Sequence, residues 1–242
     1  TARFSHTATA LLLTLGLTIF WPGVLWLAGW WFRVATPNHA SPELALALSN
    51  GLFTAGTVFW TFNFVRHVCR PKGLADAHFA WGHAGVVRLR SDTTWLLFIL
   101  TPHAFLAAGL QVHSLDPDHA TVGRVPLMLS TLAVAVYTAR VFHPKKGILH
   151  FYLERYPHSW FARLRRLWTI FAVGMPVALV VLAGIGYYFT AIELSENYLE
   201  TVWFFLLLLL LQALSLRWLL LERRKLVIEQ ALAKREAAKK AE

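Results

Sequence analysis

Long apolar stretches separated by short polar segments dominate the chain. A bilayer core requires about 20 mostly apolar residues in helical form, because lipid offers the backbone no hydrogen-bond partners. Six stretches of this kind occur along the sequence. The pattern predicts an all-α integral membrane protein with about six transmembrane helices, at about 10–32, 43–65, 93–112, 125–142, 168–190 and 201–221.

The distribution of positive charge predicts how these spans are oriented. Lysine and arginine concentrate in the short connections that stay in the cytoplasm. Of the 23 Lys and Arg residues, only Arg33 and Arg124 fall on the side opposite the amino terminus, and that side is net acidic, with Glu193, Glu196 and Glu200 in its last connection. The sequence therefore predicts that both termini are cytoplasmic.

The composition agrees with a membrane protein and argues against a soluble one. Apolar residues make up 57% of the chain and charged residues only 15%, which departs from soluble domains in both respects. The formal charge of +10 lies mostly in the inner connections, so it reports topology and does not indicate a nucleic-acid partner. The single cysteine, Cys69, allows no internal disulfide.

The connection before the fifth span is amphipathic. Trp160, Phe161 and Trp168 recur at helical spacing, while Arg163, Arg165 and Arg166 face elsewhere. This pattern is typical of a helix that lies in the headgroup layer and contacts anionic membrane lipids. A loop helix packed against its own bundle is the alternative. After the last span, 222–242 mixes both charges and is expected to continue as a cytoplasmic helical extension.

Two further sets of residues are candidates for contact with the membrane interface. Asp76 is expected to cap a second amphipathic segment, which carries Phe79, Trp81, Val86 and Val87 above Arg88 and Arg90. In the first span, tryptophans are expected to form an aromatic belt; they are Trp21, Trp26, Trp30 and Trp31.

Small residues at four-residue spacing mark candidate faces for helix packing, because helices associate in lipid through close backbone approach. Such stripes occur in the second, third and fifth spans; they are Ala47, Gly51 and Ala55, Ala104 and Ala108, and Gly174 and Ala178. Pro22 and Pro176 each remove a backbone donor inside a span and are expected to bend it.

The sequence offers no constellation of catalytic residues, so we do not expect an enzyme. Among the 11 histidines only His103 lies well inside a span, and no second buried histidine faces it to complete a haem or metal site. We therefore expect no metal and no cofactor. The spans carry no deep ionisable residue of the kind that proton-coupled transporters use.

Several segments resemble the membrane region of the large mechanosensitive channels of the MscS superfamily, of the MscK-like type or its MscM-like relative. They are RFSHTATALLLTLGL at Arg3–Leu17, CRPKGLADAHFAW at Cys69–Trp81, FHPKKGIL at Phe142–Leu149, and GYYFTAIELSENYLETVWFFLLLLLLQALSLRWLLLERRKL at Gly186–Leu226. Together these segments extend over nearly the whole chain.

The resemblance implies a multi-pass protein of the bacterial inner membrane that forms a homoheptameric channel, opened by membrane tension. Such channels release ions and small solutes on osmotic downshift, and some depend on potassium. The pore helix and soluble cytoplasmic domains of the family do not occur in this sequence, which starts without Met and reads as part of a longer polypeptide. The resemblance therefore implies a peripheral, tension-sensing helical region with no pore-lining residue. The alternatives are a structural or assembly module without a sensing role, and a small-solute transporter.

Overall fold

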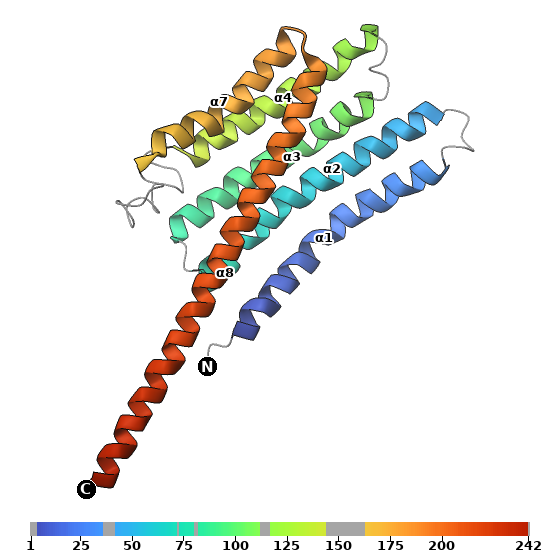
Figure 1. The fold of residues 1–242 in the computed structure, drawn as a ribbon. Helices are drawn as coiled ribbons and strands as arrows, with labels where there is room; N and C mark the ends of the chain where they lie inside the picture. Colours follow the sequence, from blue (N-terminus) through green and yellow to red (C-terminus); the bar gives the residue numbers. More distant parts are fainter. Residues whose placement is uncertain are drawn as a thin grey trace.

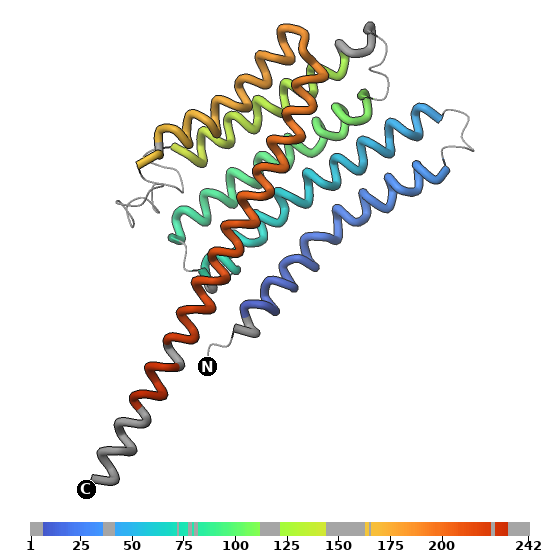
Figure 2. Tube along the Cα trace, viewed as in Figure 1, coloured from blue at the N-terminus to red at the C-terminus, as the bar shows by residue number. Residues whose placement is uncertain are grey.

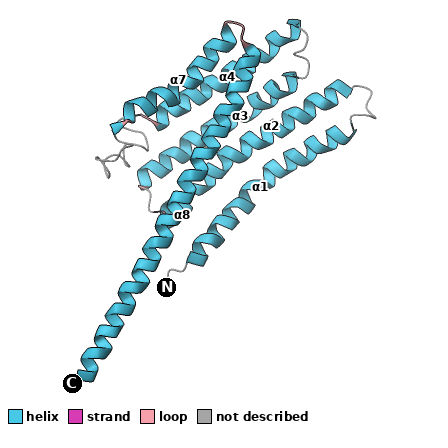
Figure 3. Ribbon diagram, in the orientation of Figure 1, coloured by secondary structure: helices cyan, strands magenta, loops and turns pink. Residues whose placement is uncertain are grey.

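A computed structural model describes residues 4–35, 42–71, 73–79, 82–111, 117–143 and 163–241. The elements in these ranges are all helical, and no strand occurs among them (Figure 3). They are α1 (Phe4–Ala35), α2 (Pro42–Val68), the single π-helical turn η2 (Leu74–His78), α3 (His83–Gln111), α4 (Pro117–Val141), α7 (Arg165–Gly184) and α8 (Tyr188–Ala241).

The first five long helices form one open layer. α1, α2, α3, α4 and α7 stand side by side in chain order, each antiparallel to its neighbour (Figure 1). α8 turns back at the end of α7 and runs obliquely across this layer. Both chain ends emerge at the same end of the layer, which we call the terminal end; the opposite end is the far end. Because extensive contacts join only neighbours in the row, the described helices form no closed bundle.

Apolar side chains from three helices hold the middle of the layer together. Val58 and Phe62 of α2 pack with Leu96 and Leu97 of α3 and with Ala133 of α4. Polar groups between the helices are mostly satisfied locally, since threonine hydroxyls donate to carbonyls one turn earlier in the same helix. Apolar contacts, together with hydroxyls bonded within their own helices, suit helices that associate in lipid by close packing.

Much of the apolar surface of the molecule remains uncovered within the single chain. All six long helices contain a segment long and apolar enough to cross a membrane, and no residue in the most apolar stretch of α8 is buried. Large exposed apolar patches are rare on soluble monomers. The predicted fold class, an all-α membrane protein with six spans, is confirmed.

The helix ends differ from expectation between the second and third spans. α3 begins at His83, so Val86, Val87, Arg88 and Arg90 form its first turns. Between α2 and α3, the only helical element among the described residues is the five-residue η2. Asp76 lies inside η2 and does not cap it, since Gly73 occupies the N-cap position. Trp81 lies outside the described residues. Hydropathy detects the apolar part of a helix but not its polar first turns.

The turn between α7 and α8 also differs from expectation. The sequence suggests a connection at 191–200, whereas the chain reverses at Ile185–Tyr187. Gly186 adopts φ +111° there, a conformation that side-chain-bearing residues rarely adopt. α8 then continues without interruption for 54 residues (Figure 2).

The early turn changes the position of the acidic residues. The Tyr198 hydroxyl donates to the Ala172 carbonyl oxygen (3.4 Å), and the rings of Trp168 and Phe205 are 6.3 Å apart. The first turns of α8 therefore run antiparallel along the whole length of α7. The exposed residues Glu193, Glu196 and Glu200 lie on this helical stretch, at the depth of α7, and not in a connecting loop.

Candidate interfacial and lipid-facing site

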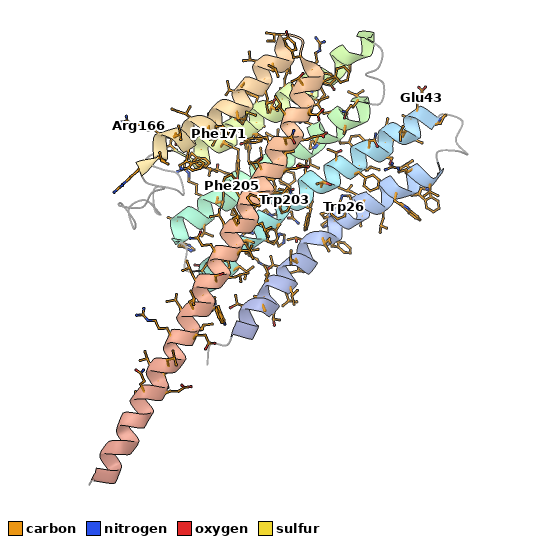
Figure 4. All side chains as sticks on the ribbon, in the orientation of Figure 1. Trp26, Glu43, Arg166, Phe171, Trp203 and Phe205 are labelled. Carbon is orange, nitrogen blue, oxygen red and sulfur yellow. The ribbon has the colours of Figure 1, made fainter. Side chains whose placement is uncertain are left out.

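The tryptophans of α1 do not all lie in the same environment. Trp21, Trp30 and Trp31 are exposed along the helix. Trp26 instead packs against α2, where its Nε1 donates to the Phe53 carbonyl oxygen (3.3 Å) and its ring meets the edge of Trp60. Figure 4 shows Trp26 between α1 and its neighbours. A belt role stays a prediction for the three exposed tryptophans.

The second group of predicted interface residues lies at the terminal end of α7. Arg163 and Arg166 are exposed, and Figure 4 shows Arg166 at the start of α7, at the edge of the layer. Arg165 is the first residue of α7, so part of the predicted interfacial helix belongs to the span itself. Trp168, one turn further, lies against Phe205. Trp160 and Phe161 lie outside the described residues.

The small-residue stripe of α2 lies at a helix contact. Ala47 and Ala55 are buried. A Cβ on Gly51 would lie 2.8 Å from the Phe105 ring and 2.9 Å from the Phe105 carbonyl oxygen, while one on Gly109 of α3 would meet the Ala47 backbone at 3.3 Å. The absence of side chains here lets the backbones of α2 and α3 approach closely. Ala104 of α3 is buried and Ala108 is half-buried.

No described residue packs closely on the stripe of α7. A Cβ on Gly174 would meet nothing within 4 Å, and Ala178 is exposed. Packing through this face therefore stays a prediction that requires a neighbouring chain. Pro22 and Pro176 are both buried. α1 continues through Pro22 and changes direction near its middle in Figure 1, while α7 continues through Pro176.

An ion-pair cluster joins α3 to α4 at the terminal end. The Asp92 carboxylate accepts from Arg140 Nη1 (3.5 Å) and lies 3.9 Å from Arg88 Nε. The Arg140 guanidinium also lies over the Trp95 ring, 5.2 Å from its centroid, within the range of a cation–π interaction. Sequence reasoning missed Asp92, because it directly precedes the apolar run and its partner Arg140 lies 48 positions away.

Basic side chains also surround a cavity of about 180 Å³ at the terminal end, between α2 and α3; they are Arg66, His67, Arg70 and Arg90. Next to it, Cys69 packs in an apolar cluster with Leu74 and Val86. Burial raises the pKa of the Cys69 thiol to about 12, although the Arg90 charge acts in the opposite direction. In the sequence, these arginines contribute only to the predicted orientation of the spans. Their closeness in space becomes visible only in the folded structure.

The described residues contain no group of three His, Cys, Asp or Glu side chains that could hold a metal ion. The His103 ring nitrogen Nδ1 donates to the Ile99 carbonyl oxygen (2.7 Å) within α3, which satisfies this histidine locally.

An open layer of five apolar helices, crossed by a sixth and carrying a basic rim at one end, defines a multi-pass helical membrane module. Comparison with protein families agrees: the model described as "Mechanosensitive ion channel inner membrane domain 1" matches residues 1–242. The chain belongs to this family, and the predicted membership of the MscS superfamily is confirmed.

Three curated proteins are similar to the chain. Miniconductance mechanosensitive channel MscM of Escherichia coli is 28% identical over 231 residues, covering 90% of this chain and 20% of the relative. An uncharacterized MscS family protein of Haemophilus influenzae is 26% identical over 197 residues, covering 81% and 17%. Mechanosensitive channel MscK of Escherichia coli is 24% identical over 181 residues, covering 74% and 15%. The chain thus spans about a fifth or less of each relative. No solved structure matches it.

Proposed function

We propose that this chain forms peripheral, lipid-exposed helices of a tension-gated channel in a bacterial inner membrane. The observation that carries the proposal is the open layer: five helices stand in a single row with α8 across it, no pore is enclosed among the described residues, and apolar side chains stay exposed on α1, α7 and α8. A surface of this kind gives lipid a large area of contact. The names of two relatives, mechanosensitive channels MscM and MscK, support a role in such a channel.

The proposed mechanism is a shift in population between two states that differ in their lipid contacts. Tension favours the state with the larger in-plane area or the flatter membrane profile, provided that each state has its own contacts. Arg163 and Arg166, at the edge of the layer, and the exposed tryptophans of α1 are the groups through which lipid would distinguish the states. Ions and small solutes would then pass, on osmotic downshift, through a pore built from other sequence of a homo-oligomer, a heptamer by family resemblance.

Patch-clamp recording of the full-length channel tests the proposal. Neutralising the arginine cluster (Arg163→Gln, Arg165→Gln, Arg166→Gln) is expected to shift the tension threshold, because it removes headgroup contacts at the edge of the layer. The matched control removes the same charge from the distal part of α8 (Lys234→Gln, Arg235→Gln, Lys239→Gln). An unchanged threshold in a folded cluster variant, or an equal shift in both variants, contradicts the proposal.

A second experiment separates sensing from scaffolding. Deleting α1–α8 while keeping the rest of the full-length channel is expected to change the gating tension if these helices sense the membrane. A channel that assembles and keeps its gating tension would support a structural or assembly module. Solute uptake by the chain in liposomes without any channel current would instead favour the small-solute transporter.

A further inference from the structure

The basic cavity at the terminal end of α2 and α3 has the composition of an anion site. Arg66 and His67 belong to the last turn of α2, Arg70 to the turn that follows, and Arg90 to α3. Its volume of about 180 Å³ corresponds to roughly six water molecules, which is enough for a phosphate group. Four basic side chains, three from two helices and one from the turn after α2, therefore converge on one small space.

Among the described residues, no carboxylate neutralises the positive charges in this cavity. The carboxylates nearest in the fold have other partners: Asp92 pairs with Arg88 and Arg140, and Asp76 lies 3.9 Å from His83. Within the described ranges, no carboxylate forms an ion pair with the cavity arginines, Arg66, Arg70 and Arg90. Guanidinium groups held close together without an anion repel one another, so an anionic ligand stabilises the arrangement.

The surroundings give the cavity a fixed shape. The His67 Nδ1 donates to the Asn63 carbonyl oxygen (2.9 Å), which orients the ring; in its imidazolium form the ring has a second N–H, at Nε2, to donate to an anion. The chain from Arg70 to Gly73 is held by a backbone bond, Gly73 N to Arg70 O (2.8 Å). Beside it the apolar cluster around Cys69 and Leu74 is buried. These contacts fix the backbone and the imidazole ring around the cavity, which lowers the entropy lost on binding.

The position of the cavity favours a lipid over a soluble anion. It lies where α2 ends and α3 begins, at the boundary of two candidate membrane spans. Headgroup phosphates concentrate at this depth, and arginine binds phosphate oxygens through two parallel N–H donors. Exposed apolar residues nearby on the layer, including Leu12 and Leu13 of α1, give acyl chains a surface to contact.

We propose that Arg66, His67, Arg70 and Arg90 form a specific binding site for the phosphate headgroup of an anionic phospholipid. The site is separate from the arginines at the start of α7, so this proposal can be tested independently of the function proposed above. It makes the terminal end of the α2–α3 pair a place where one lipid molecule binds in a defined position.

The test measures binding of phosphatidylglycerol to the delipidated full-length channel in detergent, by native mass spectrometry. The wild-type protein is expected to bind the lipid saturably. The Arg66→Gln, Arg70→Gln, Arg90→Gln variant is expected to bind it at least about tenfold more weakly, because three charge-assisted contacts are lost. The control is again Lys234→Gln, Arg235→Gln, Lys239→Gln, which should bind as the wild type does.

Three outcomes overturn the proposal. Equal weakening in both variants means that the binding is general electrostatic attraction. Full competition by inorganic phosphate at millimolar concentration means that the site takes a soluble anion. If the cavity variant does not fold, hydrogen exchange of the wild type decides: phosphatidylglycerol, but not phosphatidylcholine, should slow amide exchange at 66–73, and no difference between these lipids contradicts the proposal.

Discussion

At the scale of single residues, Gly51 sets how closely α2 and α3 can approach. A Cβ there would lie under 3 Å from the Phe105 ring and carbonyl oxygen, so Gly51→Ala is expected to destabilise the fold by about 1–3 kcal/mol through overpacking. Thermal unfolding of the full-length protein in detergent measures this.

The matched control for Gly51 is Gly174→Ala. No atom lies within 4 Å of the added Cβ, so the free energy of unfolding should stay the same or rise by up to about 1 kcal/mol, as for Gly to Ala in a helix. The reverse order of the two variants contradicts the packing described here. A loss of oligomer in the control alone would place Gly174 at a contact between chains.

Cys69 provides a residue-scale prediction that depends on pH. Its pKa is raised from 9.0 to about 12 by burial, and only the thiolate reacts with iodoacetamide. At pH 8 the folded protein should be alkylated about 1,000-fold more slowly than the unfolded chain, because the thiolate fraction is that much smaller. The pKa is raised in the folded state, so the thiol contribution to stability is full below pH 9 and falls as pH rises from 9 towards 12.

Mass spectrometry of time points checks the Cys69 prediction, with the protein in denaturant as reference. A native rate within about tenfold of the unfolded rate would mean that the thiol is accessible and ionised, against the burial seen here.

Residue-scale prediction from the sequence had a physical limit. Four-residue spacing shows which small residues share a face, but not which neighbour covers it, so Gly51 and Gly174 look alike in the sequence and differ in the fold. The same holds for Trp26 and Trp30, which look alike in the sequence. Trp26 packs and Trp30 is exposed only because of where α2 lies.

At the scale of elements, the early turn into α8 has a consequence for its carboxylates. Glu193, Glu196 and Glu200 are exposed and, among the described residues, form no ion pair with a basic side chain. They lie at the depth of α7, where a charge facing lipid is costly. We therefore predict that this face of α8 contacts water in the assembled channel.

Thiol labelling checks this face in the full-length channel with Cys69→Ala as background. The Glu196→Cys variant should react with a charged, water-soluble thiol reagent at least about tenfold faster than Leu208→Cys, because lipid excludes both the reagent and the thiolate. Leu208 is the control because it is an exposed apolar residue on the same helix. Equal, slow labelling of both positions contradicts the prediction.

The elements themselves were predictable in number and type but not at their ends. The lengths of the apolar stretches alone predict six spans, because a helix that crosses the lipid core must be apolar over its whole length. The start of α3 at His83 and the end of α7 at Gly184 were not predicted. Glutamate, arginine and histidine are tolerated in helices, so the charged segments next to these spans did not have to be loops. The sequence signal for the turn between α7 and α8 was a single glycine, Gly186, and single glycines are common in apolar helices.

At the scale of the whole molecule, the chain must leave the layer on the side where it enters. Cysteine variants of the full-length protein test this: His39→Cys lies in the connection between α1 and α2, and Lys145→Cys in the one between α4 and α7. The positive-inside rule predicts that an impermeant reagent labels the first in intact cells and the second only after permeabilisation. Labelling of Lys145→Cys in intact cells, or of both variants alike, contradicts the predicted orientation.

The sequence predicted the six spans and their basic side, but not that the helices form an open layer. The helices are apolar on most sides, so no single stripe indicates which face meets a neighbour. The cavity of Arg66, Arg70 and Arg90 could not be predicted from the sequence either, because it exists only once α2 and α3 are side by side.

The unbroken α8 has a mechanical consequence. It contains neither glycine nor proline over its 54 residues, so it is a stiff rod about 80 Å long at 1.5 Å per residue. Its first part is held against the layer, since the Trp203 ring lies 5.0 Å from the Trp60 ring and Arg217 Nε donates to Thr7 Oγ1 (2.7 Å). The part beyond Leu221 projects past these contacts as about 30 Å of helix, so a tilt of α8 against the layer is carried without bending to its distal tip.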